Sequence, residues 1–163
     1  MSRRGNPADL PFRHPAMLLA TWFGSGLLPG APGTWGSLAA LPFAWLISLA
    51  FGPVGLLISA LAAFIVGCWA ADTIAKAGGV SDPGFVVIDE VAAQWLVLAA
   101  APPHLVAYAA GFVLFRIADI VKPWPASWAD RRVHGGLGIM LDDAFAAVYA
   151  GIVLLLLVRS GLV

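Results

Sequence analysis

Long apolar stretches separated by two polar blocks define the chain. Between Arg13 and Asp72 there is no Asp, Glu, Lys or Arg, and this interval has room for two membrane crossings because one crossing needs about 20 apolar residues. Its first part, residues 17–36, is crowded with glycine and proline, so we expect an interfacial or re-entrant segment there rather than a regular span. Irregular backbone at membrane depth must be buried in protein or hydrated.

The remaining apolar sequence predicts two helical hairpins and a final single helix. Residues 37–51 and 54–71 are regular and flank a Gly-Pro turn signal. Residues 91–115 form either one long kinked span or a second hairpin with short legs. We favour the hairpin because the double proline at Pro102-Pro103 removes two backbone donors and breaks a helix. Residues 144–158 form the last predicted span.

Composition supports a membrane protein. Hydrophobic residues make up 61% of the 163 residues and charged residues 11%, whereas soluble domains carry about 25% charged residues. We therefore predict an all-α, polytopic membrane bundle of about four to five membrane-embedded helices. Residues 1–163 form one domain, in which 1–16 are a cytoplasmic tail. The formal net charge is zero, so no global basic surface favours nucleic acid, and the sequence defines no oligomeric state.

The two hairpins place both polar blocks and the N-terminal arginines on one side of the bilayer. That side carries eight of the nine basic residues, so the positive-inside tendency predicts that its charged loops face the cytoplasm. Aromatic side chains favour the membrane–water interface. We expect these tryptophans there: Trp35, Trp69, Trp95, Trp124 and Trp128.

Two adjacent acidic pairs are the first candidate site. Asp89-Glu90 and Asp142-Asp143 each precede a predicted span, and Asp119 is a third carboxylate on the same side. Adjacent carboxylates repel each other and are costly near lipid unless a cation neutralises them. Oxygen ligands without cysteine suit a hard cation such as Mg²⁺ or Mn²⁺. The alternative is helix capping, since acidic residues favour helix N-termini; two pairs on one side favour the metal site.

Basic residues accompany these carboxylates. Arg116, Asp119 and Lys122 are spaced i, i+3 and i+6, which places them along one helical face until Pro123 stops the helix. They form either a plain salt-bridge ladder or a site in which Asp119 takes a metal while the two cations meet an anion such as phosphate. Asp72 and Lys76 have the spacing of a helical ion pair.

A glycine-rich segment, PGAPGTWGS at residues 29–37, precedes the first regular helix. Free backbone N–H groups at such a start can bind an anion, and Thr34 or Ser37 can cap the helix or bind phosphate. It lacks the lysine of a Walker A loop. A simple helix cap is the alternative. Residues 130–132, which include Arg131, are interpreted as a solvated loop, and the glycines after His134 as a flexible approach to the second acidic pair.

Three blocks resemble the phosphatidylglycerophosphatase A family of bacterial membrane phosphatases: PGAPGTWGSLAALP (29–42), DPGFVVIDEV (82–91) and FRIADIVKPWPASWADRRVHGGLGIMLDD (115–143). One departure is Ala92-Ala93, where the family pattern leads us to expect a glycine. The resemblance implies Mg²⁺-dependent removal of the terminal phosphate from phosphatidylglycerophosphate in the bilayer, by a multi-pass protein of the bacterial cytoplasmic (inner) membrane whose active site faces the cytoplasm.

Combining the residues with the resemblance gives each a role. The expected metal ligands are Asp89, Glu90, Asp119, Asp142 and Asp143, and the catalytic group comprises the four aspartates among them. The expected phosphate-binding residues are Thr34, Ser37, Lys76, Arg116, Lys122 and Arg131. Either a water molecule attacks phosphorus directly or an aspartyl-phosphate forms. Two other classes of protein are weighed against this one: an ion or phosphate transporter, and a structural subunit whose charges form salt bridges only.

Overall fold

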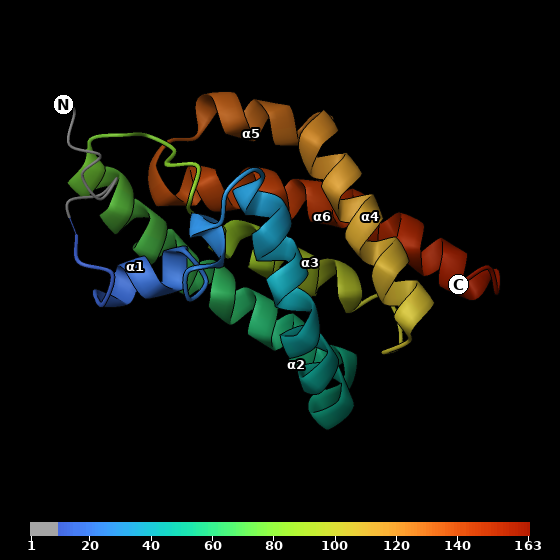
Figure 1. Cartoon of the computed structure of the whole chain (residues 1–163). Coiled ribbons are helices and arrows are strands. Elements are labelled where there is room, and N and C mark those ends of the chain that lie inside the picture. Colours follow the sequence, from blue (N-terminus) through green and yellow to red (C-terminus); the bar gives the residue numbers. More distant parts are fainter. Residues whose placement is uncertain (1–9) are drawn as a thin grey trace.

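A computed structural model describes residues 10–163 and is helical, with no strand in that range (Figure 1). The tail expected at 1–16 is described only from residue 10, and its last two residues belong to the first helix. The elements are α1 (Pro15–Ala20), a 3₁₀ turn η1 (Ser25–Leu27), α2 (Pro32–Gly78), α3 (Ile88–Leu98), α4 (Leu105–Val121), α5 (Ala126–Arg132) and α6 (Gly135–Arg159). The irregular segment predicted at 17–36 is confirmed over residues 21–31, which contain only the short turn η1.

The long helix α2 consists of two legs that meet at Gly52. This residue has φ 67° and ψ −168°, outside the helical region, and a positive φ of this kind favours glycine because it has no Cβ. Pro53 then suits the first turn of the second leg, where its missing N–H costs nothing. The chain reverses direction at this point (Figure 1). The first predicted hairpin is therefore confirmed, and Gly79 ends its second leg in a left-handed conformation.

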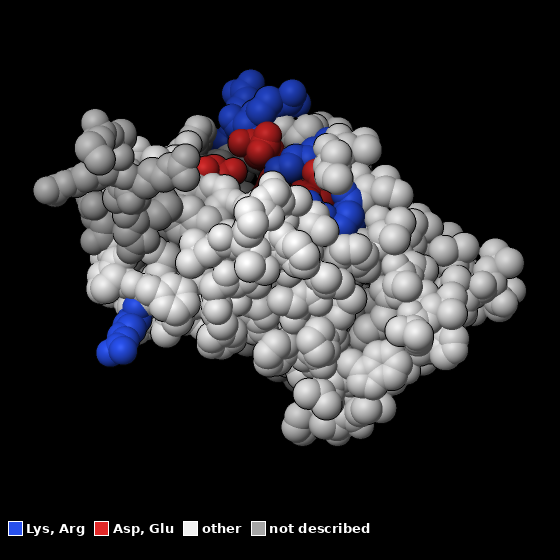
Figure 2. Space-filling model, in the orientation of Figure 1, with Lys and Arg blue, Asp and Glu red and all other residues white. Residues whose placement is uncertain are grey.

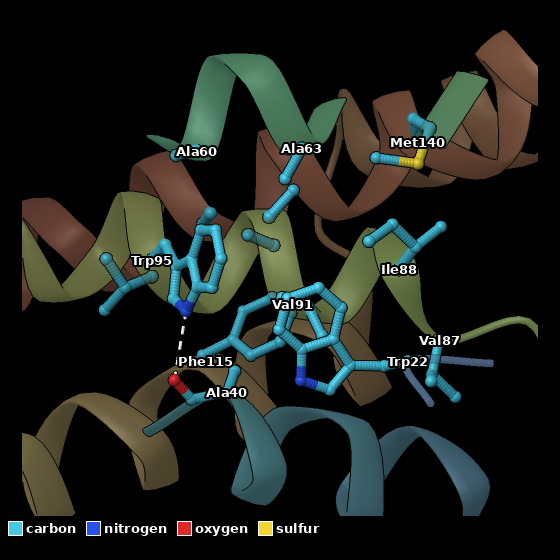
Figure 3. Packing of buried hydrophobic residues seen from close by; sticks show 14 of the residues in the cluster. Trp22, Ala40, Ala60, Ala63, Val87, Ile88, Val91, Trp95, Phe115 and Met140 are labelled. Atoms are coloured by element: carbon cyan, nitrogen blue, oxygen red, sulfur yellow. Dashed lines mark hydrogen bonds between the residues drawn. The ribbon is translucent and has the colours of Figure 1, made fainter. Parts of the chain in front are cut away.

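The second predicted hairpin is also confirmed, because the double proline lies in the loop between α3 and α4. With 11 residues, α3 is about 16 Å long, roughly half the thickness of a bilayer core. It packs against α2 and α6. The Trp95 indole N–H donates to the Ala40 carbonyl oxygen at 3.0 Å (Figure 3). Trp95 is only 6% exposed, so its predicted place at the interface is wrong: it fastens α3 to the first leg of α2.

Helix α6 begins at Gly135, nine residues before the predicted span at 144. Two expectations are corrected here: the glycines after His134 are helical rather than flexible, and residues 130–132 belong to α5 rather than to a loop. Close packing explains the first correction. A Cβ on Gly136 would lie 1.9 Å from the Cys68 carbonyl oxygen, so only glycine lets α6 begin against α2.

Two helices, α2 and α6, are long and apolar enough to cross a membrane. Large apolar side chains also face outwards over much of the surface, for example Phe51, Leu105 and Ile120. In the view of Figure 2, charged side chains gather at one rim of the molecule, apart from one basic side chain at another edge, and the broad face below the rim is uncharged. An apolar surface of this extent is typical of contact with lipid.

Candidate metal and phosphate site

Three carboxylates converge where α3 begins against α6. Asp89 and Glu90 lie in the first turn of α3, and Asp143 lies in the ninth position of α6. Each offers one oxygen, and these three oxygens all lie within 4.8 Å of one another. Because Asp143 is inside a helix that begins at Gly135, helix capping does not explain the second acidic pair. We call Asp89, Glu90 and Asp143 the acidic triad.

Each carboxylate of the acidic triad has a buried oxygen that lacks a hydrogen-bond partner in the described residues. Asp89 Oδ1, Glu90 Oε2 and Asp143 Oδ2 are inaccessible to solvent and accept no hydrogen bond from the part of the chain that the structure describes. Burial raises the pKa of Glu90 to about 8, assisted by the negative charges of Asp143 and Asp119. Burial, followed by repulsion from Glu90, likewise raises the pKa of Asp89 well above its ordinary value. These oxygen atoms suit a hard divalent cation as ligands. Such a cation would offset the free-energy cost of burying charged carboxylates and the repulsion between them.

Asp119 and Arg116 extend the site from α4. Arg116 Nη1 lies 2.9 Å from Asp119 Oδ2 and 3.9 Å from Glu90 Oε1. Asp119 also interacts with Asp143, so it lies next to the acidic triad without belonging to the group of converging oxygens. The predicted pair between Arg116 and Asp119 is confirmed. If the acidic triad held a metal ion, this guanidinium would be placed to bind a phosphate that also contacts that ion.

Lys122 occupies the end of α4 in a left-handed conformation with φ 44°. Its ammonium group donates to Asp142 Oδ2 and, at 3.3 Å, to Asp130 Oδ1. The predicted ladder is therefore only half present, because Lys122 pairs with these two residues. Asp142 is buried and its Oδ1 has no partner in residues 10–163. The five carboxylates predicted as one set of metal ligands are thus divided. Three of them converge, while Asp119 pairs with Arg116 and Asp142 pairs with Lys122.

The glycine-rich start of α2 lies directly against this cluster. A Cβ on Gly33 would lie 2.1 Å from Glu90 Oε1 and 3.1 Å from Arg116 Nη1, so the absence of a side chain allows the approach. Ser37 is buried; its hydroxyl donates to the Gly33 carbonyl oxygen at 2.8 Å and accepts from Arg116 Nη1 at 3.3 Å. Thr34 is half-buried in the same turn. The first N–H groups of a helix have no intrahelical partner, which suits an anion.

Two residues predicted to bind phosphate lie elsewhere. Lys76 pairs with Asp72 at 2.6 Å, as the helical spacing predicts, and its side chain is 77% exposed. Arg131 is exposed on α5. Sequence reasoning overlooked Gln94, which is fully buried and whose amide nitrogen and oxygen lack partners in the described range. It follows Glu90 by four residues, so a lone polar residue at helical spacing in an apolar segment was the available signal.

Known proteins match almost the whole chain. The family model described as Phosphatidylglycerophosphatase A matches residues 18–158. A protein of Escherichia coli (strain K12) named Phosphatidylglycerophosphatase A is 46% identical over 140 residues, covering 85% of this chain and 81% of the relative. One of the same name from Haemophilus influenzae is 42% identical over 141 residues, covering 86% of each.

A third relative, from Bacteroides thetaiotaomicron, is named Putative phosphatidylinositol-3-phosphatase and is 39% identical over 156 residues, covering 91% of this chain and 93% of the relative. No solved structure matches the chain. The similarities extend across the first leg of α2, the acidic triad and the basic residues of α4. The chain therefore belongs to the phosphatidylglycerophosphatase A family.

Proposed function

We propose that this protein is a Mg²⁺-dependent lipid phosphomonoester hydrolase. It converts phosphatidylglycerophosphate to phosphatidylglycerol and inorganic phosphate during phospholipid synthesis. The observation that carries the proposal is the acidic triad, in which each carboxylate has one buried, unpartnered oxygen and Glu90 lies beside the guanidinium of Arg116. Family membership supplies the class of reaction and the lipid.

The roles of the residues follow from their positions. Asp89, Glu90 and Asp143 would hold Mg²⁺, with Asp119 and Asp142 beside them. Bound Mg²⁺ would polarise the phosphoryl oxygens and lower the pKa of a water molecule. Arg116 donates to the phosphate and offsets the charge that grows on its oxygens during the reaction.

Residues around the triad complete the phosphate site. Lys122 adds a second positive charge while it holds Asp142, and the first N–H groups of α2 near Thr34 face the same anion. One carboxylate accepts the proton of the attacking water. An aspartyl-phosphate route is the alternative, and trapping an acid-stable, hydroxylamine-sensitive phosphoprotein would establish it.

Four to five helices lie in the bacterial cytoplasmic membrane in this proposal. The charged rim in Figure 2 faces the cytoplasm and the uncharged face lies in lipid. Support comes from the apolar exposed side chains and from the placement of Arg116 and Lys122 at one end of α4. The lipid tails then remain in the bilayer while the head group reaches the acidic triad.

Phosphate release from purified protein in detergent tests the function. The wild type should release phosphate from phosphatidylglycerophosphate with Mg²⁺, and EDTA should abolish the release. Asp143→Asn should insert and fold but lose activity, whereas Asp72→Asn, at a carboxylate that pairs with Lys76 outside the acidic triad, should keep it. Phosphatidic acid and phosphatidylinositol 3-phosphate serve as comparison lipids. Equal release with and without EDTA would remove the metal from the proposal.

A further inference from the structure

Two apolar cavities follow one another from the acidic triad along α3 and α6. The first has a volume of about 150 Å³, and its lining includes Asp89, Ala93 and Ala144. The second is a more open depression with a volume of about 270 Å³, and it lies between α2, α3 and α6. Leu57 and Leu96 line both cavities. The two therefore form one groove, which begins at a carboxylate of the triad and is otherwise apolar.

The groove follows one face of α3 and one face of α6. On α3, its lining residues recur every three or four positions from Asp89 to Leu96, and Ala99 and Ala100 continue the lining just after the helix; on α6 they recur in the same way from Ala144 to Leu155. Such spacing places them on one face of each helix. The seven steps from Asp89 to Leu96 correspond to about 10 Å along α3. The groove thus runs from the charged rim towards the uncharged part of the molecule.

The groove opens to the surroundings, and alanines and larger apolar residues line it together. Ile152 is 53% exposed along its outer edge. Ala60 of the second leg of α2 lies across from α3 in Figure 3 and lines the first cavity, as Met140 of α6 also does. At the end next to the acidic triad, Asp89 Oδ1 is buried without a partner in the described residues. One end is thus built for a charged group and the rest for a chain of methylenes.

We infer that this groove holds one acyl chain of the substrate lipid while its phosphate lies at the acidic triad. The inference rests on the proposed function. A diacyl phosphomonoester has its charged phosphate and its apolar chains joined in one molecule, and the groove joins the same two chemistries through Asp89. A bilayer lipid without a phosphomonoester matches the apolar part of the groove but has no group that suits the acidic triad. A methylene that moves from detergent or lipid into a groove of matching shape gains van der Waals contacts. Lipids with longer acyl chains should therefore bind more tightly than lipids with short chains.

Gly151→Leu tests the inference by filling the second cavity. A Cβ on Gly151 meets no atom nearer than Val97 Cα at 3.8 Å, so the first atom of the new side chain fits, and Gly151 lines the second cavity. Ala62→Leu is the control. Ala62 is exposed on the second leg of α2, so this substitution adds similar apolar bulk outside the groove. The substrates are dihexadecanoyl and dihexanoyl phosphatidylglycerophosphate in the same detergent.

Gly151→Leu should lower kcat/KM for the long-chain lipid severalfold, because the new side chain occupies space in which the acyl chain makes its contacts. The value for the short-chain lipid should change less, because fewer of its carbons reach the second cavity. Ala62→Leu should leave both values unchanged. Equal effects of Gly151→Leu on both lipids would overturn the groove assignment. A wild type inactive on both lipids would instead remove the proposed function.

Photo-cross-linking gives a second reading that does not depend on catalysis. Asp119→Asn protein, which keeps the acidic triad and is expected to release little phosphate, is irradiated with phosphatidylglycerophosphate that carries a diazirine at the end of one acyl chain, and the adducts are mapped by mass spectrometry. Adducts concentrated on residues 151–155, and absent with the same probe built on phosphatidylcholine, would support the groove. Adducts spread over the lipid-facing surface, equal for the two probes, or joining two copies of the chain would overturn it.

Discussion

Replacing Gly33 by alanine tests whether the start of α2 controls the acidic triad. In the structure a Cβ at this position would lie 2.1 Å from Glu90 Oε1, and atoms of this kind do not approach closer than 3.0 Å. The carboxylate must therefore retreat by about 1 Å. Because Glu90 Oε1 is the far end of a flexible side chain, it can move without disturbing the backbone. Alanine also favours a helix over glycine by about 1 kcal/mol, so the fold should remain.

A displacement of about 1 Å in a catalytic group costs on the order of 10²-fold in rate. Gly33→Ala should therefore lower kcat for phosphate release by about that factor and weaken Mg²⁺ activation, while the thermal midpoint stays near that of the wild type. Gly84→Ala is the matched control, because no atom lies within 4 Å of its added Cβ. If Gly33→Ala kept the kcat and the Mg²⁺ dependence of the wild type, the reasoning that joins α2 to Glu90 would be refuted.

Four other changes have defined outcomes. Lys122→Met leaves the buried Asp142 without its cation and should lower the free energy of unfolding by about 2 kcal/mol, measured by chemical denaturation in detergent, whereas Lys122→Arg should restore most of it. Asp119→Asn and Asp142→Asn should insert into membranes but release little phosphate; full turnover in both would remove these residues from the site. A reporter fused after Ala101, in the α3–α4 loop, should report the side of the membrane opposite to that of a reporter fused after Lys122. The same side for both reporters would show that the hairpin does not cross. In EDTA, the folded pKa of about 8 for Glu90, above its ordinary 4.5, means that the folded protein binds this proton more tightly than the unfolded chain. Its contribution to stability is complete below about pH 4.5 and is lost as the pH rises through about 8, so the thermal midpoint should fall over that interval and Mg²⁺ should raise it more at pH 8 than at pH 5.5.

The sequence predicts both hairpin turns because their causes are local. Gly52 supplies a positive φ and Pro53 a compatible helix start, while two consecutive prolines break the segment between α3 and α4. The start of α6 could not be predicted in this way. Three glycines in four residues usually indicate flexibility, but the need for glycine at Gly136 arises from the Cys68 carbonyl 68 positions earlier in the chain. That contact exists only after the helices pack.

The candidate site shows the same division. Residue type and number gave the five carboxylates, and helical spacing gave the pair between Arg116 and Asp119. Which three carboxylates converge depends on how far along its axis α6 packs against α3, and no local pattern encodes that register. Trp95 was misplaced for a related reason: its hydrogen-bond partner, the Ala40 carbonyl, lies 55 residues away. Aromatic residues in an apolar segment suit the interface and the core equally well.

A titration with Mn²⁺, monitored by electron paramagnetic resonance in detergent, tests the central claim most directly, since Mn²⁺ accepts the same oxygen ligands as Mg²⁺. Wild-type protein should bind the ion, Asp143→Asn should bind it at least about tenfold more weakly, and Asp72→Asn should match the wild type. Equal affinities for the wild type and Asp143→Asn would contradict the assignment of Asp89, Glu90 and Asp143 as the metal-binding group.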